Sequence, residues 1–78
     1  MVTYFVVNLE EKAKFEKKFQ VPFGYYAIPF FQTEEGAISY VENLREAKRN
    51  HTVVEKWENG NMEVVYEGKW YSRELDRV

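Results

Sequence analysis

The amino-acid sequence predicts an α+β fold, in which a small, mostly antiparallel sheet of about four to five strands packs on one long helix. Three observations predict it. Residues 2–7 are β-branched or aromatic, apolar residues recur at helical spacing between 33 and 50, and Asn59-Gly60 separates two alternating segments. The 78 residues suit a single domain, which we expect to span residues 1–78.

The first third of the chain begins with a predicted buried strand over residues 2–7, followed by Asn8, which can cap a helix. Residues 9–20 fit two templates. Their Glu and Lys content and the Glu10–Lys14 spacing favour a short helix, whereas most of their apolar residues occupy odd positions, as in a strand. We favour the helix, because no Gly, Pro or Asn-Gly turn is available to reverse a strand here.

Residues 21–31 form the most apolar stretch of the sequence. Pro22 and Pro29 cannot donate to a β-ladder, so a strand between them must be short or lie at a sheet edge. We therefore predict a strand over residues 23–28.

Residues 33–50 read as one long helix. Thr33 is a good N-cap, and Glu34 and Glu35 complement the helix dipole in the first turn. Asn50 suits the C-terminal end. The apolar positions at helical spacing are Ala37, Tyr40, Val41, Leu44 and Ala47.

The last third contains a predicted hairpin, because Asn59-Gly60 is the preferred two-residue type I′ turn. The expected cross-strand pairs are Trp57–Met62, Lys56–Glu63, Glu55–Val64, Val54–Val65 and Val53–Tyr66. We expect the long helix to cover the face formed by Val53, Trp57, Met62, Val64 and Tyr66. Glu55 is a misfit on this face, and we expect it to lie near an edge. Residues 69–71 would add a fifth strand or a strand end.

Composition excludes several classes of protein. There is no cysteine and one histidine, His51, so we expect no disulfide, no metal site and no cofactor. The net charge of −2 differs from that of a strongly basic nucleic-acid binder. Because there is neither a long apolar run nor a signal-peptide pattern, we expect a cytoplasmic protein that does not enter a membrane.

Catalysis finds little support in the sequence. Ser39 and Ser72 lack the setting of an activated nucleophile, and His51 follows a helix end, where a surface histidine is ordinary. The adjacent carboxylates fit solvated helix faces, and no Gly-rich phosphate loop precedes a helix. We therefore predict that the protein is not an enzyme.

The fourteen aromatic residues, 18% of the chain, are more than a two-layer domain of this size easily buries. If the long helix covers one sheet face, the other face is free to bind a protein partner or a second copy. If a first helix covers that face, the same residues are core. The candidate partner-binding residues are Tyr25, Tyr26, Val54, Val65, Lys69 and Trp70.

The alternative function is binding of single-stranded nucleic acid, which uses sheet aromatics beside lysine and arginine. The aromatic candidates are Tyr25, Tyr26, Trp57, Tyr66, Trp70 and Tyr71, and the cationic candidates are Lys48, Arg49, Lys56, Lys69 and Arg73. The charge balance makes this function less favoured than protein binding.

Residues 33–71 carry TEEGAISYVENLREAKRN followed by VVEKWENGNMEVVYEGKWY. This arrangement of a helix, an Asn-Gly hairpin and a terminal Tyr-Glu-Gly-Lys-Trp resembles small virus-encoded proteins, including some anti-CRISPR inhibitors of type I systems. The resemblance covers about half of the chain and implies a non-enzymatic viral inhibitor that binds a host complex, such as a CRISPR effector, in the host cytoplasm. Its motifs are structural, so it transfers no binding residue.

Overall fold

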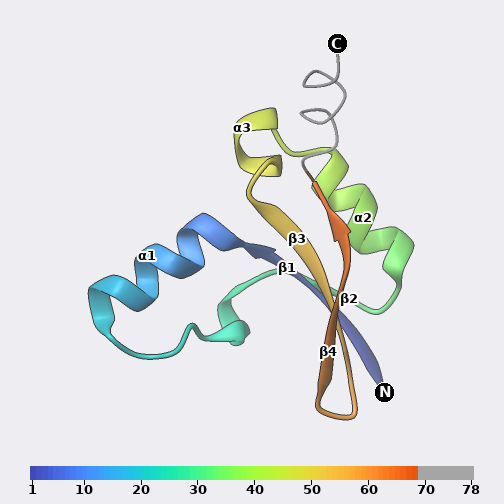
Figure 1. Cartoon of the computed structure of the whole chain (residues 1–78). Helices are drawn as coiled ribbons and strands as arrows, with labels where there is room; N and C mark the ends of the chain where they lie inside the picture. Colours follow the sequence, from blue (N-terminus) through green and yellow to red (C-terminus); the bar gives the residue numbers. More distant parts are fainter. Residues whose placement is uncertain (69–78) are drawn as a thin grey trace.

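The computed structural model describes residues 1–68 as one four-stranded antiparallel sheet with helices on both sides (Figure 1). The strand order is β2-β1-β3-β4. The α+β class and the antiparallel sheet are therefore confirmed, and the expected fifth strand at 69–71 lies outside the described residues. The elements are β1 (Val2–Asn8), α1 (Leu9–Phe19), the 3₁₀ helix η1 (Tyr25–Ala27), β2 (Phe30–Phe31), α2 (Glu34–Glu42), α3 (Glu46–Arg49), β3 (Thr52–Glu58) and β4 (Asn61–Glu67).

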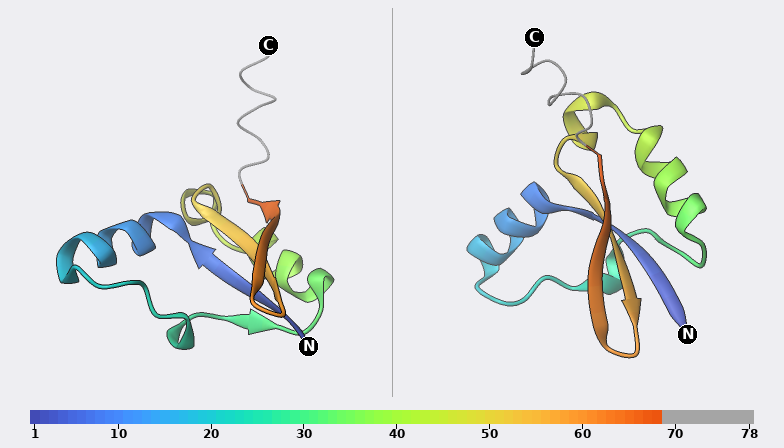
Figure 2. Two further views of the ribbon diagram at one scale, coloured as in Figure 1. Left: turned by 60° about the horizontal axis from the view of Figure 1, so that its bottom comes forward. Right: turned by 45° about the vertical axis from the view of Figure 1, so that its right-hand side comes forward.

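The main core lies between α2 and one face of the sheet, while α1 projects from the other side (Figure 2). Its buried members are Val6, Ala37, Val41 and Val54. Tyr4, Phe31, Ile38, Val65 and Tyr66 pack around them and are half-buried. Burial of apolar side chains against two strands and one helix is the principal stabilising contribution here.

The expected helix after β1 is confirmed as α1. The Asn8 side chain accepts a hydrogen bond from the Glu11 backbone N–H at 2.9 Å, which satisfies a free donor of the first turn. Gln20 ends the helix in the left-handed region, with φ of 58°. No residue of α1 is buried, so the helix is held mainly by its caps and by its aromatic side chains.

The prediction of a strand over residues 23–28 is wrong. Residues 25–27 form η1, and the strand that pairs with β1 starts only after Pro29, at Phe30. Pro29 has no N–H to donate, but its carbonyl accepts a hydrogen bond from the Val6 N–H at 3.0 Å. Pairing with β1 is confined to a two-residue edge strand that follows Pro29.

The single long helix predicted over 33–50 is also wrong, because the chain leaves the helical conformation between Glu42 and Glu46. Thr33 is confirmed as the N-cap of α2, accepting from the Gly36 N–H at 3.1 Å. Asn43 ends α2 and donates its side-chain amide to the Ser39 carbonyl at 2.9 Å. Arg45 is extended, with ψ of 151°, so α3 begins as a separate turn.

The β3–β4 hairpin turns at Asn59-Gly60 as predicted, with φ of 53° and 84°. The pairs nearest the turn, Trp57–Met62, Lys56–Glu63 and Glu55–Val64, are confirmed. A β-bulge then shifts the register, so Val54 pairs with Tyr66 and Val53 with Glu67. The predicted pairs Val54–Val65 and Val53–Tyr66 are wrong, because Val65 is an extra residue that bends β4 over the core.

The sheet face that α2 covers is the opposite of the predicted one. Val54 is fully buried beneath α2, whereas Trp57 lies on the other face with Phe5. Alternation along β3 correctly separates these two residues, but each face of the strand carries both apolar and charged side chains. The pattern therefore does not specify which face receives the helix.

Candidate functional site

The sheet face opposite α2 carries a continuous cluster of aromatic rings. Phe5 of β1 and Trp57 of β3 lie on this face, with ring centroids 6.5 Å apart. The segment after α1 returns across them and places Tyr25 edge-on to both rings, at 5.1 and 5.6 Å. The cluster consists of Phe5, Phe15, Phe19, Phe23, Tyr25, Phe30 and Trp57.

A carboxylate lies beneath these rings. Glu55 is 2% exposed, and its Oε1 accepts the Tyr25 hydroxyl at 2.8 Å and the Trp57 indole N–H at 3.1 Å. β3 directs Glu55 to this face, and Phe5 is its partner in the ladder with β1. Two donors on one oxygen compensate for the burial of the carboxylate. The expectation that Glu55 lies near an edge is wrong, because β3 is an inner strand and the carboxylate is buried there by its two donors.

The pKa of Tyr25 is raised to about 12, mainly by burial of the phenol, and further by its hydrogen bond to Glu55 and by the charges of Glu55 and Glu16. Tyr25 therefore keeps its proton well into the alkaline range and acts as a hydrogen-bond donor. Its hydroxyl holds the returning segment to the sheet.

The rings of α1 extend the cluster away from the sheet. Phe15 lies 4.8 Å from Phe19 and 5.7 Å from Phe23, between ring centroids. Glu16 Oε2 accepts the Phe23 backbone N–H at 3.1 Å, and Lys12 Nζ lies 5.9 Å from the centroid of Tyr25. These contacts join α1 to the segment that follows it.

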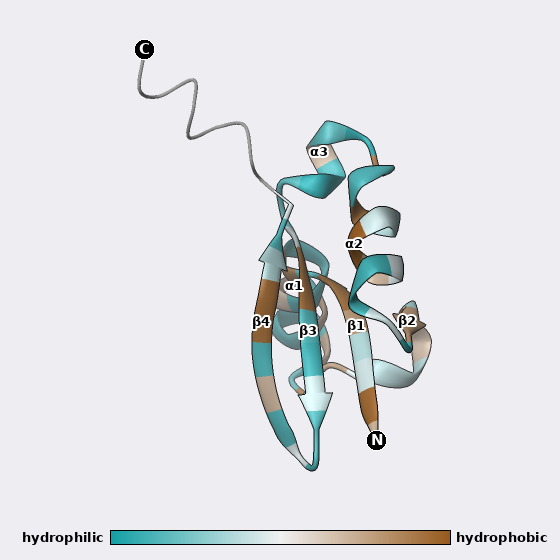
Figure 3. Cartoon of the chain, turned by 90° about the vertical axis from the view of Figure 1, so that its right-hand side faces the viewer, coloured by the Kyte–Doolittle hydropathy of each residue, from teal (hydrophilic) through white to brown (hydrophobic). Residues whose placement is uncertain are grey.

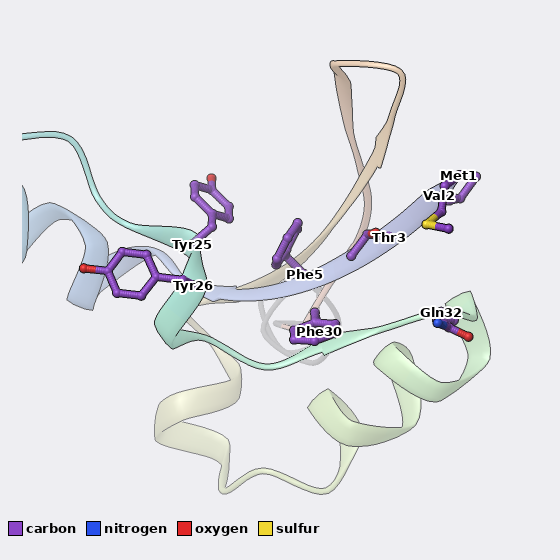
Figure 4. Close-up of a pocket in the computed structure, with 8 residues that line it drawn as sticks. All are labelled: Met1, Val2, Thr3, Phe5, Tyr25, Tyr26, Phe30 and Gln32. Atoms are coloured by element: carbon purple, nitrogen blue, oxygen red, sulfur yellow. The ribbon is translucent and has the colours of Figure 1, made fainter.

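An apolar hollow of about 660 Å³ opens beside the cluster, along the N-terminal half of β1 (Figure 4). Phe5 lies near the middle of the hollow with Tyr25 on one side of it, Phe30 lies below Phe5, and Tyr26 projects away from β1. Tyr26 is 96% exposed and Phe30 is 61% exposed. This hollow is lined by Met1, Val2, Thr3, Phe5, Tyr25, Tyr26, Phe30 and Gln32.

The candidate partner-binding residues do not lie together on one surface. Tyr25 packs within the aromatic cluster and Tyr26 lies exposed beside it. Val54 is fully buried and Val65 packs against the same core, so the prediction that these valines belong to an open face is wrong. Their predicted positions followed from placing the helix on the opposite face. Lys69 and Trp70 lie outside the described residues.

The sequence reasoning missed the residues that line most of the hollow. Phe5 was read as part of a buried strand, although alternation from Thr3 already placed both residues on one face. Phe30 was overlooked because the strand was predicted before Pro29 instead of after it. Recognising Pro29 as a strand start would have moved Phe30 into the sheet opposite Phe5.

The structure brings only some of the nucleic-acid candidates together, since Tyr25 and Trp57 pack 5.6 Å apart whereas Tyr66 lies on the α2 side. Lys69, Trp70, Tyr71 and Arg73 lie outside the described residues. Tyr25 and Trp57 donate to Glu55, and Tyr66 donates its hydroxyl to Glu42 on the α2 side at 3.1 Å. Burial and Glu42 raise the pKa of Tyr66 as well. Lys48 and Arg49 belong to α3, where Lys48 lines a small pocket together with Phe23.

Within residues 1–68 no group of histidine and carboxylate side chains is arranged to hold a metal ion. His51 is exposed in the turn before β3, and Ser39 is exposed on α2. In the same part of the chain, no helix is both long and apolar enough to cross a membrane.

Comparison with protein families, with curated proteins and with solved structures finds no match for this chain. The resemblance to small virus-encoded inhibitors therefore stays a prediction, and function must be argued from the site.

Proposed function

We propose that this chain is a non-enzymatic protein-binding module that contacts its partner through the hollow beside β1. The observation that carries the proposal is the exposure of two aromatic side chains, Tyr26 and Phe30, at 96% and 61%, around an apolar hollow. Keeping aromatic surface in water is unfavourable, and aromatic residues in such positions are typical anchors of protein interfaces. Thr3 and Gln32 add polar groups for orientation.

The test is an affinity pull-down from host lysate, with and without nuclease, using wild-type protein and the double variant Tyr26→Ala/Phe30→Ala. We expect a stoichiometric protein partner that survives nuclease, and a loss of about 2 kcal/mol or more of affinity in the double variant. Phe19→Ala is the matched control, because Phe19 is 53% exposed but lies at the end of α1, away from the hollow.

Two results would contradict the proposal. Capture that is equally strong for wild type and the double variant would place the interface elsewhere. Recovery of nucleic acid, or only of proteins lost after nuclease, would instead favour the single-strand-binding function.

The resemblance of residues 33–71 supplies a first defined partner for the proposal, a host complex such as a type I CRISPR effector. Inhibition of the purified effector by wild-type protein, and loss of inhibition in the double variant, is the expected result for a viral inhibitor. Binding to a partner from the lysate but not to the effector would support the protein-binding function and contradict the CRISPR effector as its partner.

A further inference from the structure

Strand β4 lies at one edge of the sheet and β2 at the other (Figure 3). The hollow lies along β1 and β2, away from β4. In the order β2-β1-β3-β4, no described strand lies beyond it. Residues 61–64 are all exposed, and they include two apolar side chains, Met62 at 46% and Val64 at 45%. An edge with accessible backbone and apolar side chains is the usual template for addition of another strand.

The hydrogen bonds between β3 and β4 show which backbone groups of β4 point outward. The Gly68 N–H donates to the Thr52 carbonyl at 2.9 Å, so Thr52 and every second residue after it face β4. Glu55 and Trp57 therefore face β1. Their partners on β4 are Val64 and Met62, whose N–H and C=O groups consequently point outward, away from the sheet.

The charged side chains along β4 limit which kind of strand can pair with this edge. Glu63 and Glu67 are the charged residues of β4, both exposed, and Glu58 lies exposed beside the turn. Within the described residues none of the three carboxylates forms an ion pair. Lys56, the cross-strand neighbour of Glu63, lies on the inner strand. A second copy would bring two acidic edges together, whereas a basic strand complements the edge.

We infer that the outer edge of β4 binds a basic, extended segment of a protein partner by adding it to the sheet as a further strand. Apolar residues of this segment contact Met62 and Val64, and alternating lysine or arginine residues face Glu63. Backbone hydrogen bonds form at Met62 and Val64. This surface is separate from the hollow, so the experiments can contradict strand addition at β4 and still support partner binding at the hollow, or the reverse.

The probe is a short labelled peptide of alternating valine and lysine, compared with one of alternating valine and glutamate. We expect the full chain to bind the lysine peptide at least about tenfold more tightly than the glutamate peptide. Hydrogen exchange at the Met62 and Val64 amides should slow on binding. The Glu63 amide, which faces β3, should change little.

Val64→Pro is the decisive variant, because it removes an outward N–H without removing a ladder hydrogen bond. We expect at least about a tenfold loss of peptide affinity with an unchanged circular dichroism spectrum. Val64→Ala keeps the N–H and should retain more of the affinity. Glu63→Lys should reverse the preference between the two peptides and covers the case in which Val64→Pro fails to fold.

Equal binding of both peptides, or no binding of either, would overturn the inference. So would protection of Met62 and Val64 in the absence of peptide, accompanied by concentration-dependent association in sedimentation, because the edge would then pair with a second copy.

Discussion

At the scale of single residues, Glu55 shows how the site depends on hydrogen bonding. A carboxylate that is 2% exposed is costly to bury, and it is tolerated because the Tyr25 hydroxyl and the Trp57 indole N–H both donate to it. The same two bonds tie the segment after α1 to β3. One charged residue therefore links the returning segment, the aromatic cluster and the sheet.

The raised pKa of Tyr25 predicts a loss of stability at high pH. A tyrosine in the unfolded chain ionises near pH 10, whereas Tyr25 keeps its proton up to about 12 in the folded protein. The folded state binds more protons in this range, so its free energy of unfolding falls as pH rises from 10 to 12. Urea unfolding across this range should show a shallower fall for Tyr25→Phe.

Tyr66 also has a raised pKa, but wild type and Tyr25→Phe both contain it. The difference between their free energies of unfolding across this pH range therefore reports on Tyr25 alone. Identical pH profiles for wild type and Tyr25→Phe would contradict the assigned role of the hydroxyl.

At the scale of elements, local signals were reliable where one residue type satisfies one backbone requirement. Asn8 and Thr33 accept the free N–H groups at the starts of α1 and α2, and Asn59-Gly60 adopts the positive φ angles of its turn. The end of α2 was missed because residues 44–49 continue the helical pattern. There the side chain of Asn43 competes for the Ser39 carbonyl.

The cap of α2 gives a prediction with a close control. Thr33→Ala removes the acceptor of the Gly36 N–H and should lower the free energy of unfolding by about 1 kcal/mol. Thr33→Ser keeps a hydroxyl at the same position and should cost much less. Chemical denaturation of the two variants measures the difference, and equal destabilisation would show that the hydrogen bond is not the cause.

At the scale of the whole molecule, the sheet separates two apolar assemblies with different roles. The α2 side is an aliphatic core that includes the fully buried Val54, while the other side is an aromatic cluster that leads into the exposed hollow. The hollow and the β4 edge lie at opposite sides of the sheet. This arrangement leaves room for two independent contacts on one small protein.

The assignment of the core is tested by two valines on neighbouring strands. Val54→Ala should lower the free energy of unfolding by about 2 kcal/mol, because it opens a void beneath α2. Val64→Ala should change it by less than about 0.5 kcal/mol, because that side chain is 45% exposed. Thermal or urea unfolding measures both, and a larger effect at Val64 would mean that the helix covers the other face.

The sequence by itself determined the α+β class, strand β1, the caps of α1 and α2, and the hairpin with its first three pairs. Each depends on residues that are close along the chain, so the conformational preference is local.

Only the tertiary structure decided which sheet face α2 covers, where the bulge lies and how Phe5, Tyr26 and Phe30 surround one hollow. Val53 and Val54 place an apolar side chain on each face of β3, and Glu55 and Lys56 place a charged one on each. Alternation therefore does not decide between the two arrangements, and packing against α2 selects one of them. Likewise, the role of Glu55 depends on a residue distant in sequence, because Tyr25, thirty positions away, folds back and donates a hydrogen bond to it.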